Sequence, residues 1–198
     1  MKTALLLSGG MDSVALAWWL RPDVAMTIDY GQRPAPGEIR AATAVAAELK
    51  IPHEIVRADV SQLGSGDLAG TAPSPLAPVK EWWPFRNQFL VTVAAMRGVS
   101  LGVQTLLIGC LRTDAVHSDG SQAFVQSLGH LLGLQEGALK LEAPAIGLDG
   151  VELIRRSGVP DEILAWSHSC HVSEYACGEC RGCRKHYETL TALGVAPY

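Results

Sequence analysis

An apolar run that ends in one serine and two glycines, near the start of the chain, constrains the fold more than any other stretch. Residues 5–7 have the pattern of a buried strand, Ser8-Gly9-Gly10 that of a tight turn, and a helical pattern follows directly. Glycines let the backbone come close to a ligand, and the first N–H groups of a helix point at whatever lies in such a turn. The hydroxyl groups of Ser8 and Ser13 can donate to the same place. The stretch therefore predicts a strand, a turn and a helix that together bind an anion such as phosphate.

Strand-like and helix-like segments alternate along the rest of the chain. Further strands are expected at residues 24–29, 53–57, 104–109 and 139–142, and helices at 12–20, 38–50, 86–98, 119–132, 150–157 and 184–193, with a long loop at 61–80 that is rich in Gly, Pro, Ser and Ala. Such alternation requires crossover connections, which are right-handed and give a parallel sheet. The sequence therefore predicts an α/β fold with a doubly wound, Rossmann-like parallel sheet and with ligands at the carboxyl ends of its strands.

Length and composition indicate one domain, residues 1–198, because 198 residues with 48% hydrophobic side chains can build a substantial core. Arg97 interrupts the longest apolar stretch, so we expect no membrane span. The first residues run straight into strand-like sequence without the cleavage region of a signal peptide, so we expect a cytoplasmic protein. A net charge of −4 argues against nucleic acid as a partner and favours small molecules.

Four of the five cysteines are crowded into a short stretch near the C-terminus, at Cys170, Cys177, Cys180 and Cys183. In a cytosolic chain such a cluster indicates a metal more than disulfides. Four thiolates complete a tetrahedral coordination sphere, so we expect a structural zinc within a C-terminal segment, residues 166–198. An iron–sulfur cluster is the less favoured alternative, and two histidines, His168 and His171, are spare ligands should one cysteine not bind.

The loop from Ser8 to Ser13, Ser-Gly-Gly-Met-Asp-Ser, resembles the pyrophosphate loop of the N-type ATP pyrophosphatases, the PP-loop superfamily. Ile-Asp-Tyr-Gly-Gln-Arg at 28–33 followed by Glu38, Pro-Phe-Arg-Asn-Gln-Phe at 84–89, Leu-Ile-Gly at 107–109 with Asp114, and the cysteine cluster extend the match. Over nearly its whole length the chain is similar to the QueC family, the 7-cyano-7-deazaguanine synthases. The resemblance implies a fold of the adenine nucleotide alpha hydrolase type.

The resemblance also implies an ATP-dependent carbon–nitrogen ligase. In that family a carboxylate on a deazaguanine is adenylated and attacked by ammonia, and a second activation dehydrates the amide to a nitrile. Preorganised donors suit the negative charge that develops on the phosphates, and an arginine suits phosphate or carboxylate. We therefore expect catalytic roles for Ser8, Asp12, Ser13 and Arg86, with Asp12 either holding a magnesium ion or orienting the loop. Nucleotide contacts are expected from Ser8, Gly9, Gly10, Met11, Asp12, Ser13, Asp29, Tyr30, Gln32, Arg33 and Gly109, and deazaguanine contacts from Phe85, Arg86, Asn87, Asp114 and Asp119.

Two stretches depart from the family pattern. Residues 117–121, His-Ser-Asp-Gly-Ser, replace the Tyr-Pro-Asp-Cys-Arg run that contacts the deazaguanine, so only Asp119 remains. Asp149-Gly150 stands where the family has a lysine that neutralises phosphate or adenylate charge, and we expect Arg112 or Lys80 to take over.

These departures leave the product open between a nitrile, an amide and a conjugate with another amine. We expect a homodimer that acts on ATP and a deazaguanine. Two alternatives stay open, a tRNA-modifying enzyme of the same superfamily and a nucleotide-binding module without turnover.

Overall fold

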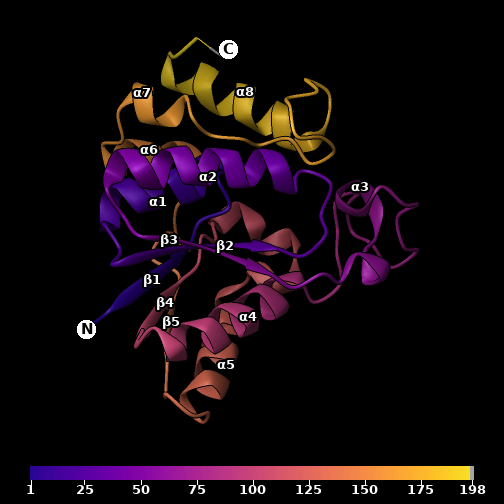
Figure 1. Cartoon of the computed structure of the whole chain (residues 1–198). Helices are drawn as coiled ribbons and strands as arrows, with labels where there is room; N and C mark the ends of the chain where they lie inside the picture. Colours follow the sequence, from indigo (N-terminus) through magenta and orange to yellow (C-terminus); the bar gives the residue numbers. More distant parts are fainter. Residues whose placement is uncertain (197–198) are drawn as a thin grey trace.

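A five-stranded, entirely parallel sheet forms the centre of the computed structural model, which describes residues 1–196 (Figure 1). The last two residues of the predicted domain and of the segment 166–198 lie outside the described residues. The strand order is β3-β2-β1-β4-β5. The strands are β1 (Thr3–Leu6), β2 (Val24–Asp29), β3 (His53–Arg57), β4 (Thr105–Leu107) and β5 (Lys140–Glu142). The order runs outward from β1 in both directions, which confirms the predicted doubly wound α/β fold.

Helices cover both faces of this sheet (Figure 1). One face carries α1 (Met11–Leu20), α2 (Ala35–Leu49) and α6 (Gly150–Ser157), with α7 (Asp161–Leu164) and α8 (Arg181–Leu193) packed outside them, and the other face carries α4 (Arg86–Ser100) and α5 (Gln122–Gly133). Helix α2 begins three residues before the predicted start, because proline is tolerated in a first turn whose N–H groups have no helical partner. Helix α8 also begins three residues early, since the Cys180 thiol accepts a hydrogen bond from the Cys183 N–H and caps the helix.

The segment predicted as a long loop, residues 61–80, contains the short helix α3 (Gly66–Ala69) and a 3₁₀ turn at Ser61–Leu63. Leu68 of α3 is buried together with Tyr30 and Trp83. The rings of Tyr30 and Trp83 meet edge to face with their centroids 4.9 Å apart. This small apolar cluster attaches the segment to the carboxyl end of β2. Two further 3₁₀ turns, Arg112–Val116 and Ser118–Gly120, precede α5.

The connections that follow β1 and β4 lead to opposite sides of the sheet. From β1 the chain proceeds to β2 and β3, and it then returns along α4 to place β4 on the other side of β1. Leu5 and Leu106 in these two strands are fully buried, so the strands are fixed at the centre of the core. A crevice is expected where neighbouring strands lead to opposite sides, outside their carboxyl ends. Within residues 1–196, no helix is both long and apolar enough to cross a lipid bilayer.

Candidate active site

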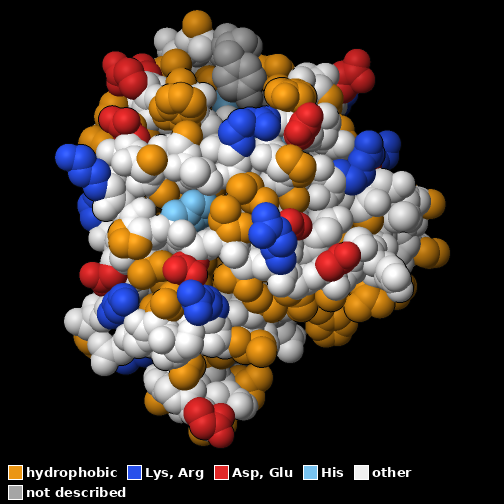
Figure 2. All heavy atoms as spheres, in the orientation of Figure 1, with side chains coloured by type: hydrophobic (Ala, Val, Ile, Leu, Met, Phe, Trp, Pro, Cys, Tyr) orange, Lys and Arg blue, Asp and Glu red, His pale blue; other side chains and the backbone are white. Residues whose placement is uncertain are grey.

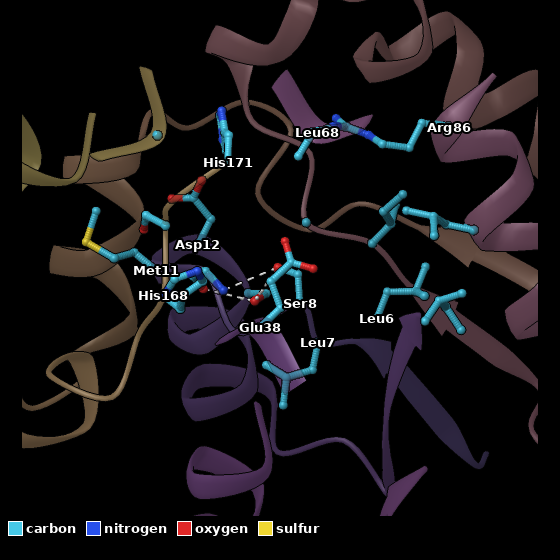
Figure 3. Close-up of a pocket in the computed structure, with 18 of the residues that line it drawn as sticks. Leu6, Leu7, Ser8, Met11, Asp12, Glu38, Leu68, Arg86, His168 and His171 are labelled. Atoms are coloured by element: carbon cyan, nitrogen blue, oxygen red, sulfur yellow. Dashed lines mark hydrogen bonds between the residues drawn. The ribbon is translucent and has the colours of Figure 1, made fainter. Parts of the chain in front are cut away.

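A cavity of about 290 Å³ lies at the carboxyl ends of β1 and β4 (Figure 3). The loop after β1 forms its floor, with Ser8 and Asp12 facing inward (Figure 3). Leu6 lies on an apolar wall, and Arg86 at the start of α4 lies across the cavity from Asp12. The C-terminal segment covers another side, where His171 faces the cavity. The fold thus places charged and hydroxyl groups from distant parts of the chain around one space at the switch point of the sheet.

The loop residues hold one another in place through short contacts. Gly9 has a φ of 83°, and a Cβ added there would lie 2.7 Å from the carbonyl oxygen of Glu38, so only glycine fits. The Ser8 and Ser13 hydroxyls lie 3.2 Å apart, the Ser13 hydroxyl donates to the Gly10 carbonyl at 2.9 Å, and the Gly10 N–H donates to Ser8 Oγ at 3.3 Å. Both hydroxyls line the cavity beside the N-terminus of α1. This arrangement can receive an anion, as the sequence predicts.

Asp12 contacts a lysine that sequence reasoning did not include in the site. Nζ of Lys185, on α8, lies 2.8 Å from Asp12 Oδ2. Among the described residues, Asp12 Oδ1 is buried without a hydrogen-bond partner. A free, inward-facing carboxylate oxygen is a suitable ligand for magnesium.

The expected replacement of the family lysine by Arg112 or Lys80 differs from what the structure shows. Arg112 pairs with the carboxylates of Asp149 and Glu152 at 3.1 and 3.2 Å. Asp149 also caps α6, because its carboxylate accepts from the Glu152 N–H. Neither Arg112 nor Lys80 lines the cavity, whereas Lys185 does. The lysine that lies beside Asp12 at the cavity is therefore on α8, and no local pattern in the sequence pointed to it.

Glu38 is a second cavity residue for which no role was predicted from the sequence. Its carboxylate faces the cavity near Ser8 (Figure 3), and Oε2 accepts a hydrogen bond from Gln32 Nε2 at 2.7 Å. Burial raises the pKa of Glu38 to about 7, against the smaller opposing effects of Gln32 and Arg86. Burial also raises the pKa of Tyr30, which lines the same cavity. The cavity thus contains a carboxyl group that changes its charge near neutral pH.

The remaining residues expected to bind nucleotide divide into two groups. Met11 and Gly109 line the cavity together with the residues already described. Asp29, Gln32 and Arg33 are not among the residues that line it. Gln32 is buried and bonds to the backbone of β2 as well as to Glu38, so in this structure it supports the site from behind.

A second cavity, of about 180 Å³, adjoins the first, and Arg86, Asn87 and Lys185 line both. Asp114 lines the second cavity, and its Oδ2 accepts from the Leu111 N–H at 2.9 Å. Its lining includes the basic side chains of Arg86, Arg181 and Lys185 and the carboxylates of Glu81 and Asp114, so this cavity can hold a polar ligand next to whatever occupies the first.

Two residues expected near a deazaguanine, Asp119 and Phe85, have other surroundings. Asp119 is not among the residues lining either cavity, and its carboxylate accepts from the Asn87 N–H at 3.0 Å. Asn87 returns a side-chain hydrogen bond to the Asp119 carbonyl at 2.8 Å. Phe85 has a φ of 55° and is 76% exposed, outside both cavities. Cys110 lines the second cavity, but burial raises its pKa to about 12, so it is a neutral thiol at physiological pH.

The four clustered cysteines come together as the spacing predicts. Their sulfur atoms all lie within 4.8 Å of one another, and two pairs, Cys177 with Cys183 and Cys170 with Cys180, are 3.9 Å apart. The group can therefore hold a metal. The same segment covers the loop after β1, since the His168 N–H donates to the Gly9 carbonyl at 2.8 Å.

Comparison with known proteins agrees with this geometry. The fold is similar to that of the U34-tRNA thiolase NcsA from Methanococcus maripaludis with its [4Fe-4S] cluster, with a TM-score of 0.53 and 18% identity over 98% of this chain and 65% of that one. At this identity the likeness shows the fold alone. The doubly wound parallel sheet and the loop after β1 define an α/β protein with an anion-binding site at the carboxyl ends of its strands.

The sequence matches the family described as Queuosine biosynthesis protein QueC over residues 2–194, and the chain belongs to this family. It is 34% identical to the 7-cyano-7-deazaguanine synthase of Nitratiruptor sp., over 100% of this chain and 99% of that protein. It is 35% identical to the one from Desulforudis audaxviator, over 93% and 94%. The chain is an ATP-dependent ligase that forms carbon–nitrogen bonds, similar to these synthases.

Proposed function

We propose that this enzyme activates the carboxylate of a 7-deazaguanine, such as 7-carboxy-7-deazaguanine, with ATP and transfers the acyl group to ammonia or another amine. The observation that carries the proposal is the pair of adjoining cavities, both of which are lined by Arg86 and Lys185. A nucleotide on the loop after β1 and a flat carboxylate ligand in the neighbouring cavity would meet at these two cations. The names of the similar proteins support the choice of deazaguanine.

In the first step a carboxylate oxygen attacks the α phosphorus of ATP, and the bond to the departing pyrophosphate breaks. Negative charge grows on the phosphate oxygens, and the donors around the loop are in place before it does. These donors are the hydroxyls of Ser8 and Ser13 and the first N–H groups of α1. Arg86 neutralises the carboxylate or the adenylate from the opposite wall. Magnesium, held by Asp12, would supply further charge neutralisation when bound.

In the second step the nitrogen of the amine attacks the acyl carbon, AMP leaves with its bonding electron pair, and the nitrogen loses a proton. With ammonia the product is a primary amide. A second round with ATP would activate the amide oxygen, and loss of AMP and a proton from the nitrogen would give the nitrile. Removing both partners from water in adjoining cavities protects the adenylate from hydrolysis.

For recognition of the deazaguanine we propose contacts from Asp114 and Asn87, which line the second cavity. A carboxylate can accept from the ring N–H and the exocyclic amine of a guanine-type edge, which an adenine-type edge cannot offer together. Asp119 supports this site by fixing Asn87 at the start of α4. Phe85 is exposed and directly precedes α4, so it would reach a ligand only after a change in its backbone conformation.

For the four cysteines we propose a structural zinc ion. Sulfur atoms on one tetrahedral zinc, each about 2.3 Å from it, lie about 3.8 Å apart, which is close to the spacing found here. In an iron–sulfur cluster the thiolates bind different iron atoms and lie farther apart. The backbone N–H groups of His171 and Cys183 donate to Cys180 Sγ, which suits a thiolate. Metal here would stabilise the segment that covers the active site.

We further propose that the enzyme acts in the cytoplasm as a homodimer on small molecules. On the face of the molecule in Figure 2, basic and acidic side chains are interspersed over the helices. A nucleic-acid partner would instead be favoured by a broad basic stripe.

Pyrophosphate release tests the proposal. Wild-type protein mixed with ATP, magnesium, 7-carboxy-7-deazaguanine and ammonium should release pyrophosphate and form an amide or nitrile, identified by mass spectrometry. Ser13→Ala should lose this activity because a phosphate donor is removed, whereas Ser61→Ala, at an exposed turn, should keep it. Nucleotide binding without pyrophosphate release would identify a binding module, and release that requires tRNA would identify a tRNA-modifying enzyme.

A further inference from the structure

Lys185, on α8, lines both cavities, but no ligand group has yet been assigned to it. We propose that Lys185 binds the phosphates of the nucleotide and, together with Asp12, completes the site from the C-terminal end of the chain. This rests on the proposed function in one respect, that the cavity takes ATP.

The position of Lys185 supports this role. It lies in the second turn of α8, two residues after Cys183, and its Nζ reaches Asp12 Oδ2 across 173 residues of sequence. It lines both cavities, and among the lysines and arginines of residues 1–196 only Arg86 does the same. Arg86 lies on the far wall, across the cavity from Asp12 (Figure 3). Lys185 is therefore the cation on the side of the loop.

The Asp12 carboxylate orients Lys185 but occupies only part of its hydrogen-bonding capacity. The lysine side chain is 42% exposed, so it retains N–H groups beyond the one that points at Asp12. A lysine ammonium can hold a carboxylate and a phosphate at once, because it is a compact charge with three donors. Without the lysine, the Asp12 carboxylate would face the phosphates with its full negative charge.

A second element approaches the same carboxylate and makes a rescue experiment possible. Gly150 is the first residue of α6, and a Cβ added there would lie 3.5 Å from Asp12 Oδ1, with Thr189 Oγ1 next at 3.8 Å. These are ordinary van der Waals distances, so a Cβ at position 150 fits. A lysine there would start beside Asp12 and could supply the missing charge from a different helix.

The competing explanation is that the Lys185–Asp12 pair only ties α8 to α1. In that case removal of the lysine would lower the melting temperature and leave nucleotide affinity unchanged. If this explanation holds, the identity of the residue at position 150 also has no effect on nucleotide affinity.

Calorimetric titration with magnesium ATP distinguishes the two explanations. Lys185→Met should weaken ATP binding by about 10- to 100-fold, the usual effect of losing one charge-assisted contact. Lys185→Arg should retain most of the affinity. Arg184→Met, which removes an exposed charge from the neighbouring position, should bind as the wild type does. Melting temperature and metal content, measured on each variant, show that the fold is kept.

The double variants decide whether charge is the cause. Lys185→Met with Gly150→Lys should recover at least part of the ATP affinity, and Lys185→Met with Gly150→Gln should recover none. Unchanged affinity in Lys185→Met, failure of Gly150→Lys to rescue, or equal rescue by glutamine would each overturn the assignment. A wild type that binds ATP but releases no pyrophosphate would contradict the proposed function and leave this test decisive. A wild type that binds no ATP would contradict both.

Discussion

Replacing Glu38 by glutamine should change how the stability of this protein depends on pH. The carboxyl group is partly buried at the cavity, where burial raises its pKa from the ordinary 4.5 to about 7. The folded state therefore keeps a proton that the unfolded state releases at lower pH. The contribution is fully present below about pH 4.5 and is lost as the pH rises through 7. Glutamine carries no charge at any pH and can still accept the hydrogen bond from Gln32.

The size of the effect follows from the two pKa values. Each pH unit between them corresponds to about 1.4 kcal/mol, so ionised Glu38 lowers the free energy of unfolding at pH 8 by at most about 3.5 kcal/mol. Urea unfolding of both proteins between pH 5 and 8 measures most of this effect. The difference in unfolding free energy, variant minus wild type, should rise by about 2.5 kcal/mol across the range, because part of the effect lies below pH 5. Glu136→Gln, at an exposed position, is the control and should show no such rise. Parallel curves for wild type and Glu38→Gln would refute the reasoning.

Three further variants test other parts of the site. Cys177→Ser should lose bound metal, measured by elemental analysis, and lower the melting temperature by several degrees, because a thiolate ligand is gone; an unchanged metal content would contradict a four-cysteine site. Gly9→Ala should weaken ATP binding at least about tenfold in calorimetry, since its Cβ would meet the Glu38 carbonyl at 2.7 Å, and wild-type affinity would show that the loop adapts freely. Asp119→Ala should weaken 7-carboxy-7-deazaguanine binding roughly 30-fold through displacement of Asn87 while leaving ATP affinity within about twofold; loss of stability alone would limit Asp119 to a structural role.

Local sequence signals predicted the elements well where those signals were strong. The strand at His53–Arg57 follows Pro52, and the helix Gly150–Ser157 follows Asp149, which caps it; both were predicted with the observed bounds. The start of α5 was placed three residues early, at Asp119, because Ser118–Gly120 forms a 3₁₀ turn and Ser121 is the residue whose side chain caps the helix. Competing capping residues close together cannot be ranked without the tertiary contacts.

Parts of the site depended on long-range packing and could not be predicted in this way. The loop after β1 and the cysteine cluster were recognisable because their residues are neighbours in the sequence. Lys185 meets Asp12 only because α8 packs over α6 and the start of α1, and no local pattern encodes that meeting. Phe85 was expected near substrate, but its left-handed backbone turns the ring into solvent. Gln32 was expected to touch nucleotide, and it instead bonds to Glu38.

The hydrogen bond from His168 to Gly9 has a consequence for the order in which the protein matures on the ribosome. All five strands leave the ribosome before the residues that cover the loop, so the sheet can assemble while the nucleotide site is still open. The covering segment and Lys185 dock only after nearly the entire chain has been translated. A nascent chain that ends after α7 would thus have a folded sheet but an incomplete ATP site, and nucleotide binding would report the last event of synthesis and folding rather than the first.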